Sequence, residues 1–154
     1  MQYWLMKSEP SEFSINDFTI TNNFSVEWFG VRNYQARNFM VREMQLGDLA
    51  LFWHSSCKNP GIYGVVEISK EAHPDMTQFD PANEYFDPKA TAKHPIWYCV
   101  TVKLVRKIQY ISIKELRGVA GLEDMQVLKK GNRLSITGVT DKEWEIIQHL
   151  IKSV

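Results

Sequence analysis

The segment from residue 28 to residue 39, WFGVRNYQARNF, gathers side chains that are suited to binding nucleic acids. Asn, Gln and Arg present hydrogen-bond donors and acceptors that match base edges and phosphates. Aromatic rings supply flat faces on which bases stack. The segment is also typical of a well-capped surface helix, because Asn33 is a good N-cap residue. A nucleic-acid contact, an active site and a structural role are therefore all open for it.

The chain has five tryptophans, which is many for its length. Trp4 lies in an apolar run and Trp144 lies on the apolar stripe of a predicted helix, so both are expected in the core. Trp28, Trp53 and Trp97 lie at the boundaries of predicted elements, beside polar residues. If two of these rings face each other across a pocket, the gap suits a planar ring or a methylated group. Core packing remains an equal alternative for Trp53 and Trp97.

A few polar residues lie within reach of such a pocket. Lys7 and Ser8 directly follow the first predicted strand, and Asn33 begins a predicted helix. Asn33 is either a pocket contact or a helix cap, since one side-chain oxygen can hardly do both. Arg133, in the motif GNRLS, is either a phosphate contact or a solvated charge at the end of a strand.

No catalytic or metal-binding set stands out in the sequence. His54 and Ser55 are adjacent and Asp48 is near them, but neighbours on a strand point to opposite faces, so His54 cannot easily activate Ser55. The other histidines are scattered singly, and no spacing indicates a metal site. We therefore expect no cofactor and no metal. An enzyme would have to use His54, Asp48 or Glu9 as its base.

Length and composition are those of an ordinary globular domain of 154 residues, 44% hydrophobic and 23% charged. Lys plus Arg and Asp plus Glu balance at 18 each, so any nucleic-acid contact must come from a local site. Cys57 and Cys99 lack the paired spacing of a zinc site and are expected as reduced thiols in a cytoplasmic protein. We expect no signal peptide and no membrane helix.

Hydrophobic patterning and capping residues predict a single α+β domain, residues 1–154, with a small β-barrel and short flanking helices. The strands are predicted at 3–6, 49–56, 62–69, 97–105 and 134–136, and the helices at 14–17, from Asn33 to about Met44, at 125–130, and after the capping boxes at 112–115 and 140–143. The connection SCKNPG predicts a hairpin between the second and third strands. In the helix after Asn33, Val31, Tyr34, Val41 and Met44 are expected to share the inner side.

Five segments, in order YWLMKSEP, WFGVRNYQARNFM, GDLALFWHSS, PGIYGVVEI and GNRLSI, resemble an EVE domain, most closely the thymocyte nuclear protein family and its bacterial relatives. The resemblance covers essentially the whole chain. It implies a PUA-like fold, a compact β-barrel flanked by helices, related to the YTH readers of methylated adenine in RNA. It also implies a pocket for a modified base, with modified cytosine in DNA as the leading candidate.

The resemblance to YTH readers includes Lys7-Ser8 after the first strand and the tryptophan at Trp28, which in that family helps to cage the base. The second cage aromatic is sought among Trp53, Tyr85, Phe86 and Trp97. The full pocket set that we predict is Lys7, Ser8, Trp28, Asn33, Trp53, His54, Ser55 and Trp97. Phosphate contacts are predicted from Arg32, Arg37 and Arg133.

The function predicted from these observations is non-catalytic binding of a modified base in DNA or RNA. A base inside a duplex cannot enter a closed pocket, so the nucleic acid must be single-stranded or the base flipped out. Two alternatives are a nucleic-acid-processing enzyme that acts on the modified base and a sensor of nucleotide-type small molecules.

Overall fold

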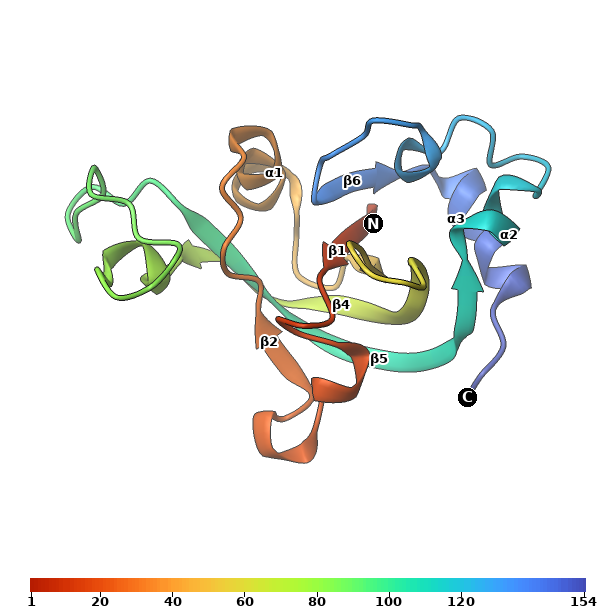
Figure 1. Cartoon of the computed structure of the whole chain (residues 1–154), viewed down its shortest axis with the longest axis horizontal. Coiled ribbons are helices and arrows are strands. Elements are labelled where there is room, and N and C mark those ends of the chain that lie inside the picture. The colour runs from red at the N-terminus through yellow and green to blue at the C-terminus, as the bar shows by residue number, and fades with distance from the viewer.

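The computed structural model describes residues 1–154 and is built on one six-stranded sheet (Figure 1). The strands are β1 (Tyr3–Ser8), β2 (Ser25–Glu27), β3 (Leu49–His54), β4 (Gly61–Pro74), β5 (Tyr98–Ser112) and β6 (Ile136–Val139). Their order across the sheet is β2-β5-β4-β3-β1-β6. The pair β1 and β3 is parallel, and every other neighbouring pair is antiparallel. The predicted hairpin between β3 and β4 is confirmed.

The sheet is strongly curved but stays open. Register shifts interrupt the pairing of β4 with β5 at several positions, and such irregularities bend and twist a strand. In Figure 1, β5 sweeps across the molecule and then turns upward beside α2. The two outer strands, β2 and β6, do not pair with each other. The α+β class is therefore confirmed, whereas the sheet does not close into the barrel that we expected.

Two hydrophobic cores lie on opposite faces of this sheet, because successive side chains of a strand point to opposite sides. Trp4 and Phe52 belong to the core that also contains Trp28. Trp53 belongs to the other core, which contains Trp144. Trp4 and Trp144 are both buried, as predicted.

Short helices fill the connections. The α-helices are α1 (Tyr34–Asn38), α2 (Ile113–Arg117) and α3 (Asp141–Leu150), with a π-helix η3 (Phe39–Glu43) and 3₁₀ turns at Ile15–Asp17, Ile20–Asn22, Met76–Phe79 and Gln126–Leu128. Thr140 and Glu143 form the predicted capping box of α3. None of these helices is long and apolar enough to cross a membrane.

The helix after Asn33 differs from the prediction in its inner face. Met44 is buried as expected, but Tyr34 and Val41 are exposed, and Ala36 and Met40 are buried instead. The π-helical turn Phe39–Glu43 adds a residue to the turn and so rotates Val41 and the positions that follow. Tyr34 precedes this turn, and its ring stacks on Trp97.

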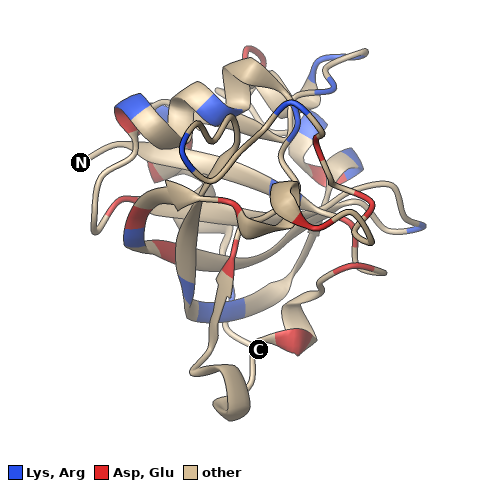
Figure 2. Cartoon of the chain, turned by 90° about the vertical axis from the view of Figure 1, so that its left-hand side faces the viewer, with Lys and Arg blue, Asp and Glu red and all other residues tan.

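In the C-terminal third of the chain, two elements also differ from the prediction. The predicted helix at 125–130 is only the 3₁₀ turn Gln126–Leu128, and β6 begins at Ile136 instead of ending there. The ribbon in Figure 2 shows positions of Lys and Arg interspersed with positions of Asp and Glu along the chain, which has 18 residues of each sign.

Candidate nucleic-acid interface

A cavity of about 550 Å³ lies at the carboxyl ends of β1 and β2 and just beyond β3. This volume lies within the range of small-molecule sites, about 300–1,000 Å³. The residues that line it are Lys7, Ser8, Glu9, Glu12, Phe13, Val26, Glu27, Trp28, Phe29, Gly30, Val31, Ser55, Ser56, Tyr85, Asn132, Arg133 and Ser135.

Strand pairing brings three distant segments together at this cavity. The parallel register of β1 and β3 sets Ser8 beside His54, and the Ser55 amide donates to the Ser8 carbonyl at 3.0 Å. The Lys7 amide donates to the carbonyl of Ser135, just before β6, at 2.8 Å. The Lys7 ammonium is half-buried, and burial lowers its pKa below the usual value.

The aromatic part of the lining comes from Trp28, Phe29 and Tyr85. Trp28 is only 7% exposed, and its ring packs edge-on against Phe52 with the centroids 5.7 Å apart. Phe29 is exposed and meets the Tyr85 ring edge-on at 6.1 Å. Trp28 therefore belongs to the core and to the cavity wall at once.

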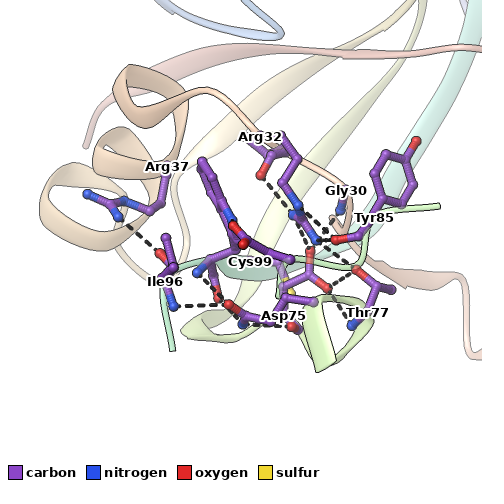
Figure 3. A network of polar contacts seen from close by, with 12 residues as sticks. Gly30, Arg32, Arg37, Asp75, Thr77, Tyr85, Ile96 and Cys99 are labelled. Atoms are coloured by element: carbon purple, nitrogen blue, oxygen red, sulfur yellow. Dashed lines mark hydrogen bonds and ion pairs between the residues drawn. The ribbon is translucent and has the colours of Figure 1, made fainter. Parts of the chain in front are cut away.

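Arg32 ties the loop after β2 to the segment that carries Tyr85 (Figure 3). Its Nη2 donates to the Tyr85 carbonyl at 2.7 Å, and its Nη1 lies 3.2 Å from the buried carboxylate of Asp75. Asp75 also accepts from the Gly30 amide at 2.8 Å. Burial alone would raise the pKa of Asp75, but hydrogen bonds from Thr77, Gly30 and Arg32 hold it below its usual value. The carboxylate therefore stays charged and anchors both segments.

Tyr85 is held from its ring side as well. A Cβ at Gly30 would lie 2.7 Å from the Tyr85 ring, so the ring needs the glycine in order to pack this closely. The Tyr85 hydroxyl donates to the carboxylate of Glu12. Burial, with the neighbouring Glu12, raises the pKa of the Tyr85 hydroxyl, so this group remains a neutral donor.

The structure brings five of the predicted residues to the cavity: Lys7, Ser8, Trp28, Ser55 and Arg133. Asn33, His54 and Trp97 lie outside it, and Trp53 lines only a smaller cavity that adjoins it. Of the four aromatics considered for the second wall, only Tyr85 lines the cavity.

Local geometry explains why Trp53 and Asn33 do not line the base cavity as predicted. Trp53 follows Phe52 along β3, so its ring points to the opposite face of the sheet, where it is buried in the core that contains Trp144. Asn33 caps α1, and its Oδ1 accepts from the Ala36 amide at 3.0 Å. The cap reading of Asn33 is therefore the right one.

Trp97 also has a structural role. It is 5% exposed, its Nε1 donates to Asp87 at 2.9 Å, and its amide donates to Gln78 at 2.8 Å. The ring stacks on Tyr34 with the centroids 4.9 Å apart. Its boundary position in the sequence did not distinguish this buried packing from a pocket role.

Two of the three predicted phosphate contacts are engaged inside the chain. Arg32 is occupied by Asp75 and Tyr85, and Arg37 donates to the Ile96 carbonyl at 3.0 Å and lies over the Tyr34 ring. Arg133 alone lies at the cavity, with an exposed side chain.

Sequence reasoning missed several lining residues, among them Glu12, Glu27, Phe29, Gly30 and Asn132, and it considered Glu9 only as a possible base. Most of them are immediate neighbours of Lys7-Ser8, Trp28 or Arg133. Extending each predicted motif by a residue or two on either side would have found them. Glu12 is different, because its role depends on Tyr85, which is 73 residues away.

His54 has a structural role under the loop that follows β1. Its Nε2 accepts from the Ile15 amide at 3.1 Å, and its ring stacks on Tyr63 with the centroids 3.9 Å apart. Asp48, another candidate base, is buried and accepts from Trp4 and from the amides of Gln2 and Gln45. No group of three or more His, Cys, Asp or Glu is placed to hold a metal.

The environment of His54 predicts a pH dependence of stability. Burial lowers the pKa of His54 and outweighs the nearby Asp17 carboxylate, which raises it. Below about pH 6.5 the unfolded chain binds a proton that the folded chain resists. The free energy of unfolding should therefore fall as the pH decreases from about 7 to 5.5. Urea titrations across this range measure the slope, which should be smaller in His54→Gln; equal slopes would contradict the assignment.

The sequence model of the EVE domain matches residues 2–150 of the chain. The chain belongs to the EVE domain family. This EVE domain is 41% identical to mouse thymocyte nuclear protein 1 over 165 residues, which cover 96% of this chain and 73% of the mouse protein. The human protein of the same name has the same identity and coverage.

Solved structures share the fold of this EVE domain. Human THYN1 in complex with DNA containing 5-methylcytosine superposes with a TM-score of 0.88 at 41% identity, covering 97% of each chain. A Pseudomonas putida protein superposes with a TM-score of 0.89 at 44% identity, covering 96% of this chain and 98% of that one. The PUA-like α+β architecture expected from the motifs is thus the fold of the family, here with an open sheet.

Proposed function

We propose that this EVE domain binds a modified cytosine of DNA in the cavity between Trp28 and Tyr85, without converting it. The observation that carries the proposal is the convergence of Lys7, Ser8, Trp28 and Tyr85 on one cavity of about 550 Å³. The 41% identical human THYN1, solved with DNA containing 5-methylcytosine, supports the choice of ligand.

The polar groups of the lining suit a cytosine base. Cytosine presents an exocyclic amino group, for which Glu or Asp is the usual acceptor. Glu9 and Glu27 line the cavity with exposed side chains. Glu27 Oε1 lies 3.3 Å from His73 Nε2, whereas the Glu9 carboxylate makes no hydrogen bond or ion pair within the chain. Lys7 and Arg133 supply donors for the ring acceptors and the flanking phosphates. The cavity therefore offers both kinds of partner that the base edge needs.

The apolar groups of the lining suit the methyl group. Phe13, Val26 and Trp28 provide an apolar surface beside the polar groups. Burying one methyl group is worth about 0.8 kcal/mol, which corresponds to roughly fourfold in affinity. We therefore expect discrimination between methylated and unmodified cytosine to be moderate.

Fluorescence anisotropy with matched oligonucleotides tests the proposal. A single-stranded DNA carrying one 5-methylcytosine should bind about fourfold more tightly than the same strand with cytosine. A duplex should bind more weakly than the single strand, because extruding the base costs a few kcal/mol. Equal affinity for the methylated and unmodified strands would contradict the proposal. Preference for a methylated RNA strand, or for the free nucleoside, would favour the alternatives.

Binding without conversion is checked on the same oligonucleotide. His54 and Asp48 are held in structural hydrogen bonds, so of the three candidate bases only Glu9 lines the cavity. After incubation with excess protein, nucleoside analysis by mass spectrometry should recover all of the 5-methylcytosine. A product that forms with the native protein and not with Glu9→Gln would favour an enzyme.

A further inference from the structure

A second cavity, of about 340 Å³, adjoins the proposed base cavity. The two share Lys7, Ser55, Ser56 and Asn132, so they are neighbouring parts of one concave surface. Lys7, near the carboxyl end of β1, lines both of them. A ligand that fills the first cavity and continues as a chain can therefore reach the second.

The charge of the second cavity differs from that of the first. Lys7, Arg117, Lys129 and Lys130 line it, and no Asp or Glu does. Three glutamates line the first cavity. In a chain whose formal net charge is zero, this groove is a local concentration of positive charge. It suits an anion.

The groups of this groove are available to a ligand. Lys129 and Lys130 are exposed, and neither side chain has a hydrogen-bond or ion-pair partner within the chain. The amides of Lys130 and Gly131 also donate no hydrogen bond within the chain. Gly131 has a φ of +81°, and a Cβ placed on it would meet nothing within 4 Å, so the backbone here is open to approach.

Arg117 holds the segment that leads into Lys129 and Lys130. Its Nη2 donates to the Leu128 carbonyl at 3.2 Å, one residue before Lys129. Asn132 accepts from the Lys7 ammonium through its carbonyl and donates through its side chain to the Gln126 carbonyl at 3.0 Å. The lysines are thus carried on a turn that is tied to the strand at the base cavity.

We propose that the groove of Lys7, Arg117, Lys129 and Lys130 binds the backbone phosphates of the nucleotides that flank the base in the first cavity. This inference rests on the function proposed above. It assigns the phosphate contacts to the turn at 129–133 in place of Arg32 and Arg37, which the structure engages elsewhere. This proposal also implies that the bound DNA strand runs across the surface from the base cavity toward α2.

Salt dependence of binding tests the phosphate groove. With about three phosphates neutralised, the log–log slope of affinity against salt for single-stranded DNA should be about −2. The double variant Lys129→Ala/Lys130→Ala should reduce the magnitude of this slope by about 1.4. It should also weaken binding about tenfold in 0.1 M salt, at roughly threefold for each lost charged contact.

A matched control keeps the charge change and moves it away from the groove. Lys142→Ala/Lys152→Ala removes two exposed lysines that line neither cavity, and it should leave the slope nearly unchanged. Equal effects of the two double variants would overturn the phosphate assignment, because the change in slope would then follow from net charge alone. An unchanged slope in Lys129→Ala/Lys130→Ala would overturn it as well.

Failure of the groove and failure of the base cavity give different results. If both assignments hold, Lys129→Ala/Lys130→Ala weakens methylated and unmethylated strands by the same factor and leaves binding of 5-methyldeoxycytidine nucleoside unchanged. If the groove holds and the base cavity does not, the slope still changes, but methylated and unmethylated strands bind equally in the native protein. If the double variant weakens binding of the nucleoside, which has no phosphate, the groove assignment is wrong.

Discussion

Trp28→Ala is expected to lose both folding stability and binding of the methylated strand. The ring is 93% buried and packs against Phe52, so truncation should lower the free energy of unfolding by about 3–5 kcal/mol. The same ring lines the base cavity. Loss of base stacking is worth about 1–3 kcal/mol, so binding by the folded protein should weaken about 5- to 150-fold. The sequence predicted Trp28 as a wall of the pocket, and its burial adds a cost in folding stability.

Trp144→Ala is the matched control for this experiment. Trp144 is equally buried and stacks on Tyr3 with the ring centroids 4.3 Å apart, but it lies in the other core and lines neither cavity described above. Its truncation should cost a similar free energy of unfolding and leave the affinity of the folded protein unchanged. Urea unfolding gives the stability of each variant, and titration at a temperature where both remain folded gives the affinity. Native affinity in folded Trp28→Ala would show that the ring is a core residue only.

Arg32→Met should destabilise the protein and weaken binding without changing the salt slope. The substitution leaves the buried Asp75 carboxylate without its charged partner, and breaking such a pair costs about 3–5 kcal/mol, reduced here because Arg32 is partly exposed. It also removes two hydrogen bonds to the Tyr85 carbonyl, which hold one wall of the cavity. The slope should stay native, because the Arg32 guanidinium is engaged by Asp75 and Tyr85 inside the chain.

Arg133→Met serves as the counterpart of Arg32→Met. Arg133 is exposed at the cavity and has no ion-pair partner within the chain, so its replacement should leave the free energy of unfolding nearly native. It should reduce the salt slope by about 0.7 if the side chain meets one phosphate. A native unfolding midpoint together with a reduced slope in Arg32→Met would reverse the roles that we assign to the two arginines.

Local patterns in the sequence predicted most of the elements and part of the site. The cap at Asn33 and the capping box at Thr140 depend on residues at most three positions apart, so they are legible in the chain itself. Trp4 and Trp144 could be assigned to the core from the apolar patterns around them. Motifs shared with the EVE family pointed to Lys7, Ser8 and Trp28, which the structure brings to one cavity.

Only the tertiary structure decided which residues complete that cavity. Alternation along β3 says that Phe52 and Trp53 point to opposite faces, but the parallel pairing with β1 and the packing of the helices determine which face meets Trp28. Arg32 is of a residue type that often contacts phosphate, but its guanidinium pairs with Asp75, 43 residues away. Tyr85 becomes a wall because Arg32, Gly30 and Glu12 hold it from three sides. Such contacts join residues far apart in the chain, so no local spacing encodes them.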